Sequence, residues 1–202
     1  MFRDVHGMDN SNRSSHIFKI VAGGAGGVGK TTFFLRYTNG LFLSNTSMTV
    51  GVAFHTRDII KDQAKIKIFA WDLSGQPRFR CMQDTYLLGA VAGMLFFDLS
   101  RPESISEVHE WVNLLRTKGS PSMPIILIGT KLDLVAPEQE AATIKAGESM
   151  ADLLGLSFFI KTSSKTDVNV SEAFDRLVEL LLQKQSSTQR AITPAMQVFP
   201  TT

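Results

Sequence analysis

Residues 24–31 read GAGGVGKT and carry the clearest chemistry in this 202-residue sequence. They fit the pattern G-x-x-x-x-G-K-[ST], whose glycines let the backbone curl so that several N–H groups face a polyphosphate. In such a loop Lys30 would neutralise the outer phosphates, and the Thr31 hydroxyl would ligate Mg²⁺. The alternative is a glycine-rich turn with a chance lysine. The loop lies between a buried strand and a helix start, which favours phosphate binding.

A second group of residues, Asp72-Leu73-Ser74-Gly75-Gln76, would complete that chemistry. A carboxylate at a strand end can hold Mg²⁺ through water, and the Gly75 N–H can meet a terminal phosphate. The Gln76 carboxamide can both donate to and accept from an attacking water. Thr49, in an earlier loop, could close over Mg²⁺ and the last phosphate. Each pattern alone also suits an ordinary turn or loop.

Two further groups could read a base. Thr130-Lys131-Leu132-Asp133 follows an apolar strand, at the edge where open α/β sheets bind ligands. Asp133 could accept both N–H groups of the N1/N2 edge of guanine, which adenine lacks, while the Lys131 stem covers the ring. The alternative is a turn with a solvated ion pair. Residues 162–165, Thr-Ser-Ser-Lys, could offer backbone N–H groups to O6, although such small-residue loops are common.

Regular alternation of strands and helices must position these residues. The sequence predicts strands at 17–22, 52–60, 64–72, 91–98, 124–129 and 157–161, and helices at 30–39, 102–118, 138–154 and 170–183. The short interval 61–63 predicts an antiparallel hairpin. We therefore expect an α/β fold whose mostly parallel six-stranded sheet contains one antiparallel strand and carries helices on both faces.

The composition favours one domain and gives little support to several other classes of protein. Hydrophobic residues make up 44% and charged residues 20%, and the net charge of +2 without a basic run argues against nucleic-acid binding. No apolar run reaches the ~20 residues that span a bilayer, and the polar start is unlike a signal peptide. The single cysteine, Cys81, excludes an internal disulfide. We expect a disordered tail at 1–15, one domain at 16–184 and a flexible tail at 185–202.

The five groups occur in the order found in the Ras superfamily of small GTPases, which the chain resembles over residues 17–184. Thr31 and Thr49 are eighteen residues apart, as in that family, and residues 49–54, TVGVAF, look most like the Rab branch. The resemblance implies a P-loop NTPase G domain that binds GTP/GDP and Mg²⁺. It implies a molecular switch in signalling or vesicle trafficking that hydrolyses GTP slowly without an activating partner.

The resemblance also implies residue roles. Gln76, Lys30 and Thr49 would be catalytic, and Thr31, Thr49 and Asp72 would hold the metal. The nucleotide would be bound by Gly24, Gly26, Gly27, Val28, Gly29, Lys30, Thr31, Thr32, Phe42, Thr49, Gly75, Thr130, Lys131, Asp133, Ser163, Ser164 and Lys165. Phe42 would pack against the guanine or ribose.

The chain departs from the family pattern at several positions. Thr130 replaces the commoner asparagine, as in the Rho branch, and Ser74 and Pro77 flank the Gly75-Gln76 pair. These departures leave an alternative, a constitutively nucleotide-loaded interaction module with negligible hydrolysis. A P-loop kinase would share the phosphate loop, but it would not account for Thr-Lys-Leu-Asp.

The resemblance implies partner proteins as well. An activating protein, an exchange factor and effectors would bind residues 41–54 and 71–86, with Phe54, Trp71 and Tyr86 as an aromatic contact surface; the alternative places those rings in the core. Residues 41–48 contain no basic side chain, and Pro77 constrains Arg78 and Arg80 beside Gln76. We therefore expect a partner to supply the missing positive charge. Phe2 and the cysteine-free tail predict no direct lipid anchor. We expect a monomer that is cytoplasmic and recruited to membranes by partners.

Overall fold

The computed structural model describes residues 14–76, 78–79 and 83–192, whose strands form one six-stranded sheet in the order β2-β3-β1-β4-β5-β6. Its strands are β1 (Ser15–Gly24), β2 (Val52–Lys61), β3 (Ala64–Leu73), β4 (Ala92–Asp98), β5 (Ile125–Thr130) and β6 (Phe158–Lys161). Neighbouring strands run parallel except β2 and β3, which form an antiparallel hairpin. The predicted mixed sheet is therefore confirmed.

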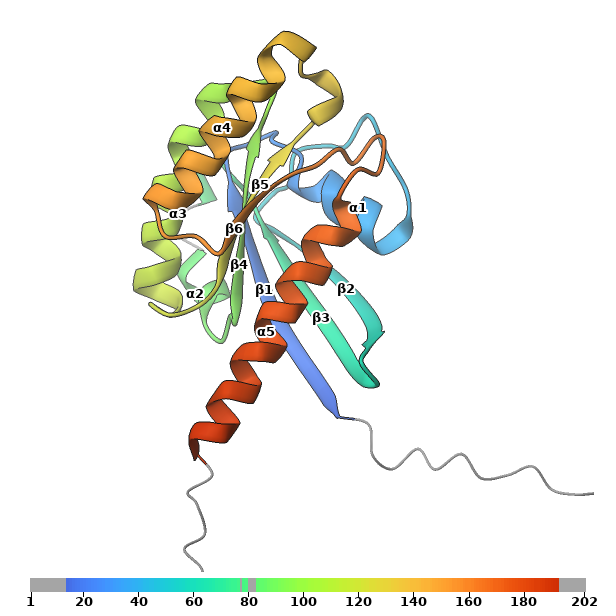
Figure 1. The fold of residues 1–202 in the computed structure, drawn as a ribbon. Helices are drawn as coiled ribbons and strands as arrows, with labels where there is room; N and C mark the ends of the chain where they lie inside the picture. Colours follow the sequence, from blue (N-terminus) through green and yellow to red (C-terminus); the bar gives the residue numbers. More distant parts are fainter. Residues whose placement is uncertain (1–13, 77, 80–82, 193–202) are drawn as a thin grey trace, which may run out of the picture.

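Helices cover both faces of this sheet, as predicted. The α-helices are α1 (Lys30–Asn39), α2 (Gln83–Leu87), α3 (Val108–Leu114), α4 (Pro137–Leu153) and α5 (Val170–Ile192). Figure 1 shows α1 and α5 on the side of the sheet away from α3 and α4. This two-sided cover explains why β4 and β5 are buried along their whole length.

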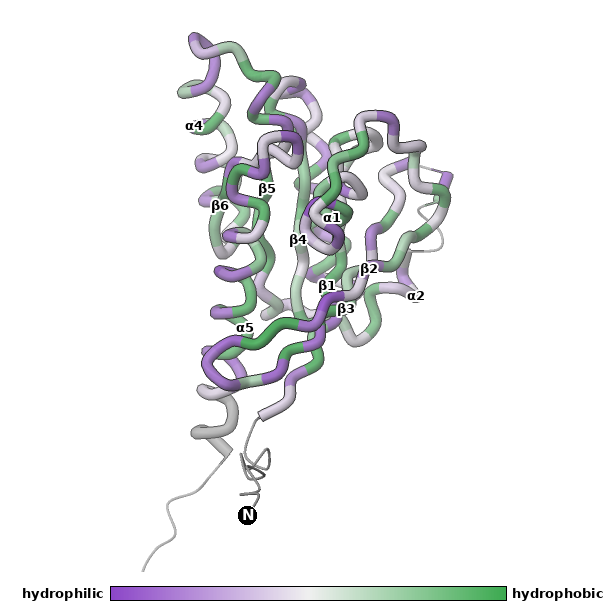
Figure 2. The backbone as a smooth tube through the Cα atoms, turned by 90° about the vertical axis from the view of Figure 1, so that its right-hand side faces the viewer, coloured by the Kyte–Doolittle hydropathy of each residue, from purple (hydrophilic) through white to green (hydrophobic). Residues whose placement is uncertain are grey.

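The hydrophobic core has one layer on each side of the sheet. On the first side, Phe33 and Phe34 of α1 meet Phe174 of α5 over β1 and β4. On the other side, Trp111 of α3 and Leu115 pack against the opposite face of the central strands. The edge hairpin is different, because burial alternates residue by residue along β3, and short hydrophobic and hydrophilic stretches follow one another along β2 (Figure 2).

Four elements differ from the sequence prediction. The segment 102–118 is not one α-helix: a 3₁₀ turn (Pro102–Glu107) precedes α3, and a π turn (Leu115–Gly119) follows it. Helix α2 lies in a segment that we expected to be loop. Helix α5 continues to Ile192, so residues 185–192 are helical rather than part of a flexible tail, and β1 already begins at Ser15.

The last turns of α5 lie beyond its buried stripe. Its apolar stripe stops at Leu181, but Ser186 Oγ and Ser187 Oγ donate to the carbonyls of Leu182 and Gln183 at 3.0 and 2.9 Å. A helix that packing has already nucleated extends through polar residues at little cost. An apolar pattern therefore marks where a helix is buried, not where it ends.

The fold brings the loops after β1, β3, β5 and β6 to one end of the sheet, the end at which parallel strands finish. The start of β1 and the end of α5 lie at the other end (Figure 1). Across the described part of the chain, no helix combines the length and the apolar character needed to cross a membrane.

Candidate nucleotide site

The phosphate loop leaves the central strand β1 and enters α1. Gly24 has a φ of 132°, and a Cβ there would lie 2.2 Å from the Phe96 carbonyl oxygen of β4. Glycine is therefore required where the chain turns out of the sheet. Helix α1 begins at Lys30 with no acidic residue in its first turn, so its positive dipole end faces the loop uncompensated.

Lys30 points into the loop that precedes it. Its buried Nζ donates to the carbonyls of Gly24 and Ala25 at 2.8 and 2.9 Å. Burial lowers the pKa of Lys30 to about 8, even though the charges of Asp72 and Glu107 act to raise it. A desolvated ammonium at this position gains strongly from a phosphate, because opposite charge favours the protonated form.

Three oxygen-bearing side chains converge beside Lys30. The hydroxyls of Thr31 and Thr49 lie 2.6 Å apart, and Thr31 donates a short hydrogen bond to Asp72. Burial raises the pKa of Asp72, opposed by the Lys30 charge and by the hydrogen bonds from both hydroxyls. The other oxygen, Asp72 Oδ1, is buried without a hydrogen-bond partner.

This donor set fits Mg²⁺. Hydroxyl and carboxylate oxygens are the ligands that this hard cation prefers, and the orphaned Asp72 Oδ1 is a further oxygen acceptor in the same place. Within the described ranges, no group of three or more His, Cys, Asp or Glu side chains could hold a metal ion. Mg²⁺ usually takes several of its ligands from phosphate oxygens and water, which agrees with a site that offers few protein oxygens.

His55 is a neighbour of this cluster that the sequence analysis missed. Its ring stacks on Phe34 at 4.9 Å, and its buried Nε2 has no hydrogen-bond partner and lies 4.0 Å from Asp72 Oδ2. Burial lowers the pKa of His55, which favours the neutral imidazole. The only sequence signal is its place within a predicted strand, at 52–60.

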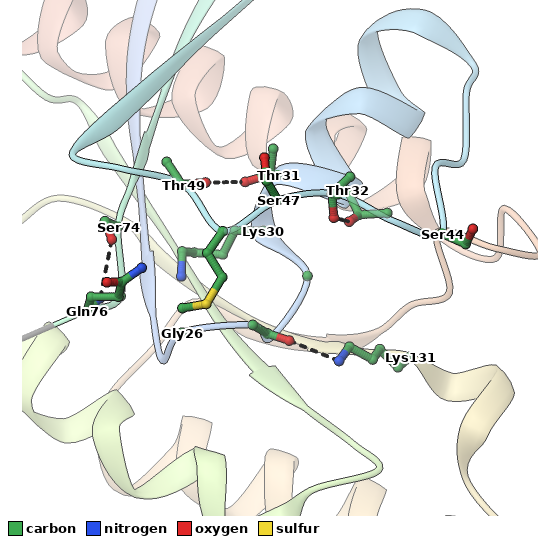
Figure 3. A pocket seen from close by; sticks show the side chains of 15 residues that line it. Gly26, Lys30, Thr31, Thr32, Ser44, Ser47, Thr49, Ser74, Gln76 and Lys131 are labelled. Carbon is green, nitrogen blue, oxygen red and sulfur yellow. Dashed lines mark hydrogen bonds between the residues drawn. The ribbon is translucent and has the colours of Figure 1, made fainter.

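Gly75 and Gln76 close the cavity from the β3 side. A Cβ on Gly75 would lie 2.3 Å from the Gly24 carbonyl oxygen and 2.5 Å from the Gly26 nitrogen, so only glycine fits against the phosphate loop. The Gln76 N–H donates to Ser74 Oγ at 3.3 Å. Figure 3 shows Lys30 between Gln76 on one side and the Thr31–Thr49 pair on the other.

These residues surround one cavity of about 270 Å³. Its lining comprises Gly26, Gly27, Gly29, Lys30, Thr31, Thr32, Ser44, Thr46, Ser47, Met48, Thr49, Ser74, Gly75, Gln76 and Lys131. The loop between α1 and β2 forms one wall, held in part by Thr46 Oγ1, which lies 3.2 Å from Thr32 Oγ1. We call this the phosphate cavity.

A smaller cavity of about 60 Å³ lies next to it and is called the base cavity. Its lining comprises Gly29, Thr32, Thr130, Lys131, Asp133, Ser164 and Lys165. Asp133 Oδ1 accepts from Ser163 Oγ at 2.6 Å, and Lys165 Nζ lies 4.0 Å from Asp133 Oδ2. The two sequence groups after β5 and β6 are thus brought together.

Thr130 and Lys131 tie the two cavities to each other. Thr130 Oγ1 lies 2.5 Å from the Val28 carbonyl and 3.0 Å from the Phe97 carbonyl, so its single proton serves the phosphate loop or β4. Lys131 Nζ donates to the Gly27 carbonyl at 2.9 Å and pairs with Asp98 at 2.8 Å. The threonine therefore still braces the phosphate loop where an asparagine is the commoner residue.

Asp98 anchors that brace at the end of β4. Burial acts to raise the pKa of Asp98, but hydrogen bonds from Lys131, Ser100 and Arg101 outweigh it and hold the pKa below the ordinary value. The carboxylate is thus charged and fully used within the protein. No pattern in the sequence singled out this residue.

Some predicted residues stand apart from the cavities. Phe42 is 37% exposed and lines neither cavity. Gly24, Val28 and Ser163 are buried and line neither cavity. Asp72 also lines neither cavity and contacts the hydroxyls of Thr31 and Thr49. Pro77, Arg80 and Cys81 lie outside the described residues, so the predictions that involve them remain predictions.

The three predicted surface aromatics form one cluster. Phe54 packs edge-on against Trp71 at 4.4 Å between ring centres, and Trp71 lies 5.3 Å from Tyr86. Phe54 is 57% exposed and the other two rings are half-buried, so the alternative that all three are core residues is wrong. The cluster lies where β2 and β3 approach the phosphate cavity.

Comparison with known proteins gives a consistent result. Residues 19–183 match the model of the Ras family. The chain is similar to the Ras-related protein Rab-3C of Bos taurus, with 33% identity over 94% of this chain and 84% of the relative. It is 32% identical to Ras-related protein Rab-3A of Homo sapiens, over 90% and 81% of the two chains. Ras-related protein Rab-3 of Caenorhabditis elegans is also 32% identical, over 86% and 78%.

Proposed function

The chain belongs to the Ras family of small GTPases, and from this premise we propose that its phosphate cavity and base cavity together bind one guanine nucleotide. As a Rab-like member it is a GTP/GDP switch that hydrolyses GTP. The observation that carries the residue assignments is the convergence of Lys30, Gln76 and the Thr31–Thr49–Asp72 cluster around one cavity.

The phosphates lie along the loop between β1 and α1, whose N–H groups and helix dipole attract negative charge. Lys30 releases the carbonyls of Gly24 and Ala25 and turns to the outer phosphates, which restores its full charge. Thr31 and Thr49 would hold Mg²⁺, with Asp72 behind them, and the ion would supply positive charge that neutralises the phosphates.

Hydrolysis depends on a positioned water. Gln76 lines the cavity beside Gly75, whose N–H meets the terminal phosphate, so the Gln76 carboxamide can orient water for attack in line with the leaving group. Loss of the terminal phosphate removes the contact that orders the loops around Thr49 and Gly75. Those two loops are then the switches.

The base is read at the smaller cavity. Asp133 accepts the N1 and N2 hydrogen atoms of guanine, while Ser163 holds the Asp133 carboxylate in place from behind. The stem of Lys131 covers the ring, and the backbone of residues 163–165 meets O6. Phe42 would reach the guanine or ribose only if the loop after α1 moves, because it lies away from both cavities in this structure.

We expect slow intrinsic hydrolysis, on the order of 10⁻⁴ to 10⁻³ per second, because no arginine is among the described residues that line the phosphate cavity. Among the described residues that line the phosphate cavity, the basic ones are Lys30 and Lys131. An activating partner that binds residues 41–54 and 71–86 supplies the missing charge. The same surface, with its cluster of Phe54, Trp71 and Tyr86, receives effectors and exchange factors in signalling or vesicle trafficking.

A single-turnover assay tests this function. Protein loaded with GTP and Mg²⁺ should release phosphate slowly, and Gln76→Leu should slow release at least tenfold while GTP affinity stays within about twofold. Replacing both Arg78 and Arg80 with alanine should leave the rate nearly unchanged. Unchanged hydrolysis in Gln76→Leu, or most of the hydrolysis lost in the double arginine variant, would overturn these assignments.

The alternative of a constitutively loaded module is not favoured by the family findings. The same assay tests this alternative. If fully loaded protein releases no measurable phosphate, the constitutively loaded module becomes the better account. We further propose that the protein acts as a cytoplasmic monomer and that partner proteins bring it to membranes. We propose residues 16–184 as its functional domain, which the family match over residues 19–183 supports.

A further inference from the structure

Arg36 is a side chain of α1 that lines neither cavity yet contacts the loop behind one of them. Its Nε donates to the Ser164 carbonyl at 2.6 Å, and its Nη2 donates to the Lys165 carbonyl at 3.1 Å. Its Nη1 donates to the Gly40 carbonyl at 2.8 Å, at the point where the chain leaves α1. One half-buried guanidinium thus joins two segments that lie more than a hundred residues apart in the sequence.

These contacts fix the orientation of peptide planes in the base cavity. A peptide bond is planar and trans, so its N–H points away from its carbonyl oxygen. Because Arg36 holds the Ser164 carbonyl oxygen, the Lys165 N–H of the same peptide must point away from Arg36. The planar fork of the guanidinium has donors at fixed angles, which a flexible ammonium cannot reproduce.

The rest of the loop is held from its inner side. Ser163 Oγ donates to Asp133 and accepts from the Thr166 N–H at 3.1 Å, and the Ser163 backbone pairs with Val168. Ser164 and Lys165 are the two residues of this loop that line the base cavity, and Arg36 donates to both of their carbonyls. The Lys165 N–H therefore takes its direction from a residue outside the site, whereas the Ser164 N–H is set by Val168, which donates to the Ser163 carbonyl.

We propose that Arg36 is a positioning residue that orients the Lys165 N–H as a hydrogen-bond donor to O6 of guanine. The inference rests on the proposed function, because it requires that guanine occupy the base cavity. Arg36 lines neither cavity; it acts through the peptide that joins Ser164 and Lys165. Asp133 reads the N1/N2 part of the same edge, and its hydrogen bond comes from Ser163, which Arg36 does not contact. Loss of Arg36 should thus weaken recognition of O6 more than recognition of the 2-amino group.

Three nucleotides separate the two kinds of recognition. GDP has O6 and the 2-amino group, 6-thio-GDP replaces O6 with a poorly accepting sulfur, and IDP lacks the 2-amino group. The affinities of the full-length protein are measured by competition against a fluorescent GDP analogue. In Arg36→Met, the preference for GDP over 6-thio-GDP should fall about 3- to 10-fold, as expected for one lost hydrogen bond. The preference for GDP over IDP should stay within twofold.

Two further variants control the result. Arg36→Lys keeps the charge but not the fork, and it should behave like Arg36→Met. Arg57→Met removes an arginine that stacks on Tyr37 at 4.3 Å, and it should change neither preference. Because each preference is a ratio measured on the bound fraction of one protein, partial unfolding of a variant cancels.

The outcomes are distinct. An equal loss of affinity for all three nucleotides in both Arg36 variants would show that the contact is merely structural, and would overturn the inference. A change confined to the preference for GDP over IDP would overturn it as well. If the unmodified protein does not prefer GDP over ADP, the proposed function itself fails. If it has that preference but the 6-thio-GDP ratio survives in the variants, only the role of Arg36 is wrong.

Discussion

Burial opposes charge in the phosphate cavity, whereas the charged groups around the base cavity are paired. Burial lowers the pKa of Lys30 to about 8 and raises that of Asp72, whose Oδ1 has no partner. Around the base, Asp133 is held by Ser163, and Lys131 pairs with Asp98. The first cavity therefore gains most from the charge of its ligand. The second is arranged in advance and selects by hydrogen-bond pattern.

The largest expected effect tests the phosphate side. Lys30→Met should lower the affinity for GDP by roughly 10²- to 10⁴-fold, since it removes charged hydrogen bonds to phosphate. The affinity for IDP should fall by the same factor, because Lys30 does not contact the base. Competition titration measures both, and Lys145→Met on the exposed face of α4 is the control. A loss below threefold, or one that differs between the two nucleotides, would break the comparison.

The base side should respond in selectivity rather than in total affinity. The unmodified protein should prefer GTP over ATP at least tenfold, because adenine leaves the Asp133 carboxylate unpaired. Asp133→Asn replaces an acceptor with a donor and should move the preference toward xanthine nucleotides. The affinities for GDP, XDP and ADP, measured on both proteins, report this change in preference. Comparable affinities for GTP and ATP before mutation would contradict the assignment of Asp133.

Packing gives the next prediction, at the wall of the phosphate cavity. Gly75→Ala places a Cβ 2.3 Å from the Gly24 carbonyl oxygen, so the loop must shift at a cost of about 1–3 kcal/mol. Gly26→Ala meets its nearest atom, Met48 Cε, only at 3.6 Å and should change stability by less than ~0.5 kcal/mol. Urea unfolding compares the two. Equal stability of both variants would show that Gly75 does not abut the loop in solution.

The smallest effect concerns the paired charges near the base. The pKa of Asp98 is lowered in the folded protein, so its carboxylate contributes stability above the ordinary value of about 3.9. That contribution disappears as pH falls through the lowered pKa, because the folded state must then bind the proton. The free energy of unfolding of the unmodified protein should exceed that of Asp98→Asn at pH 7, and this difference should shrink below about pH 4. Urea unfolding of both proteins measures it. An advantage that is constant from pH 7 to 3 would contradict this pairing.

The sequence predicted the parts of this molecule that rest on local patterns. The glycine loop at 24–31 needs its residue types for backbone reasons, and the two strand-like runs separated only by residues 61–63 predict the hairpin that the structure has. The order of strands and helices then places the groups after β3, β5 and β6 at one edge. Periodicity and the positions of glycine thus carry most of the fold and the outline of the site.

The missed features depend on contacts that no local pattern encodes. Arg36 reaches carbonyls 128 and 129 residues away, and any residue type could have supplied those acceptors. His55 looks like one more inward residue of a strand until its distance to Asp72 is known. Phe42 shows the converse, because a resemblance assigns its role but does not fix where a loop lies.

The place of β1 in the sheet has a consequence for synthesis of the chain. This strand emerges from the ribosome first, yet it stands between β3 and β4, and its last pairing partner is Phe96. At about 5–20 residues per second, translation from the end of β1 through β4 takes on the order of 4–15 s. During that interval Phe18, Ile20 and Val21 have no strand on at least one side to shield them. The strand at the centre of the finished sheet is thus exposed on one side until β4 has been made.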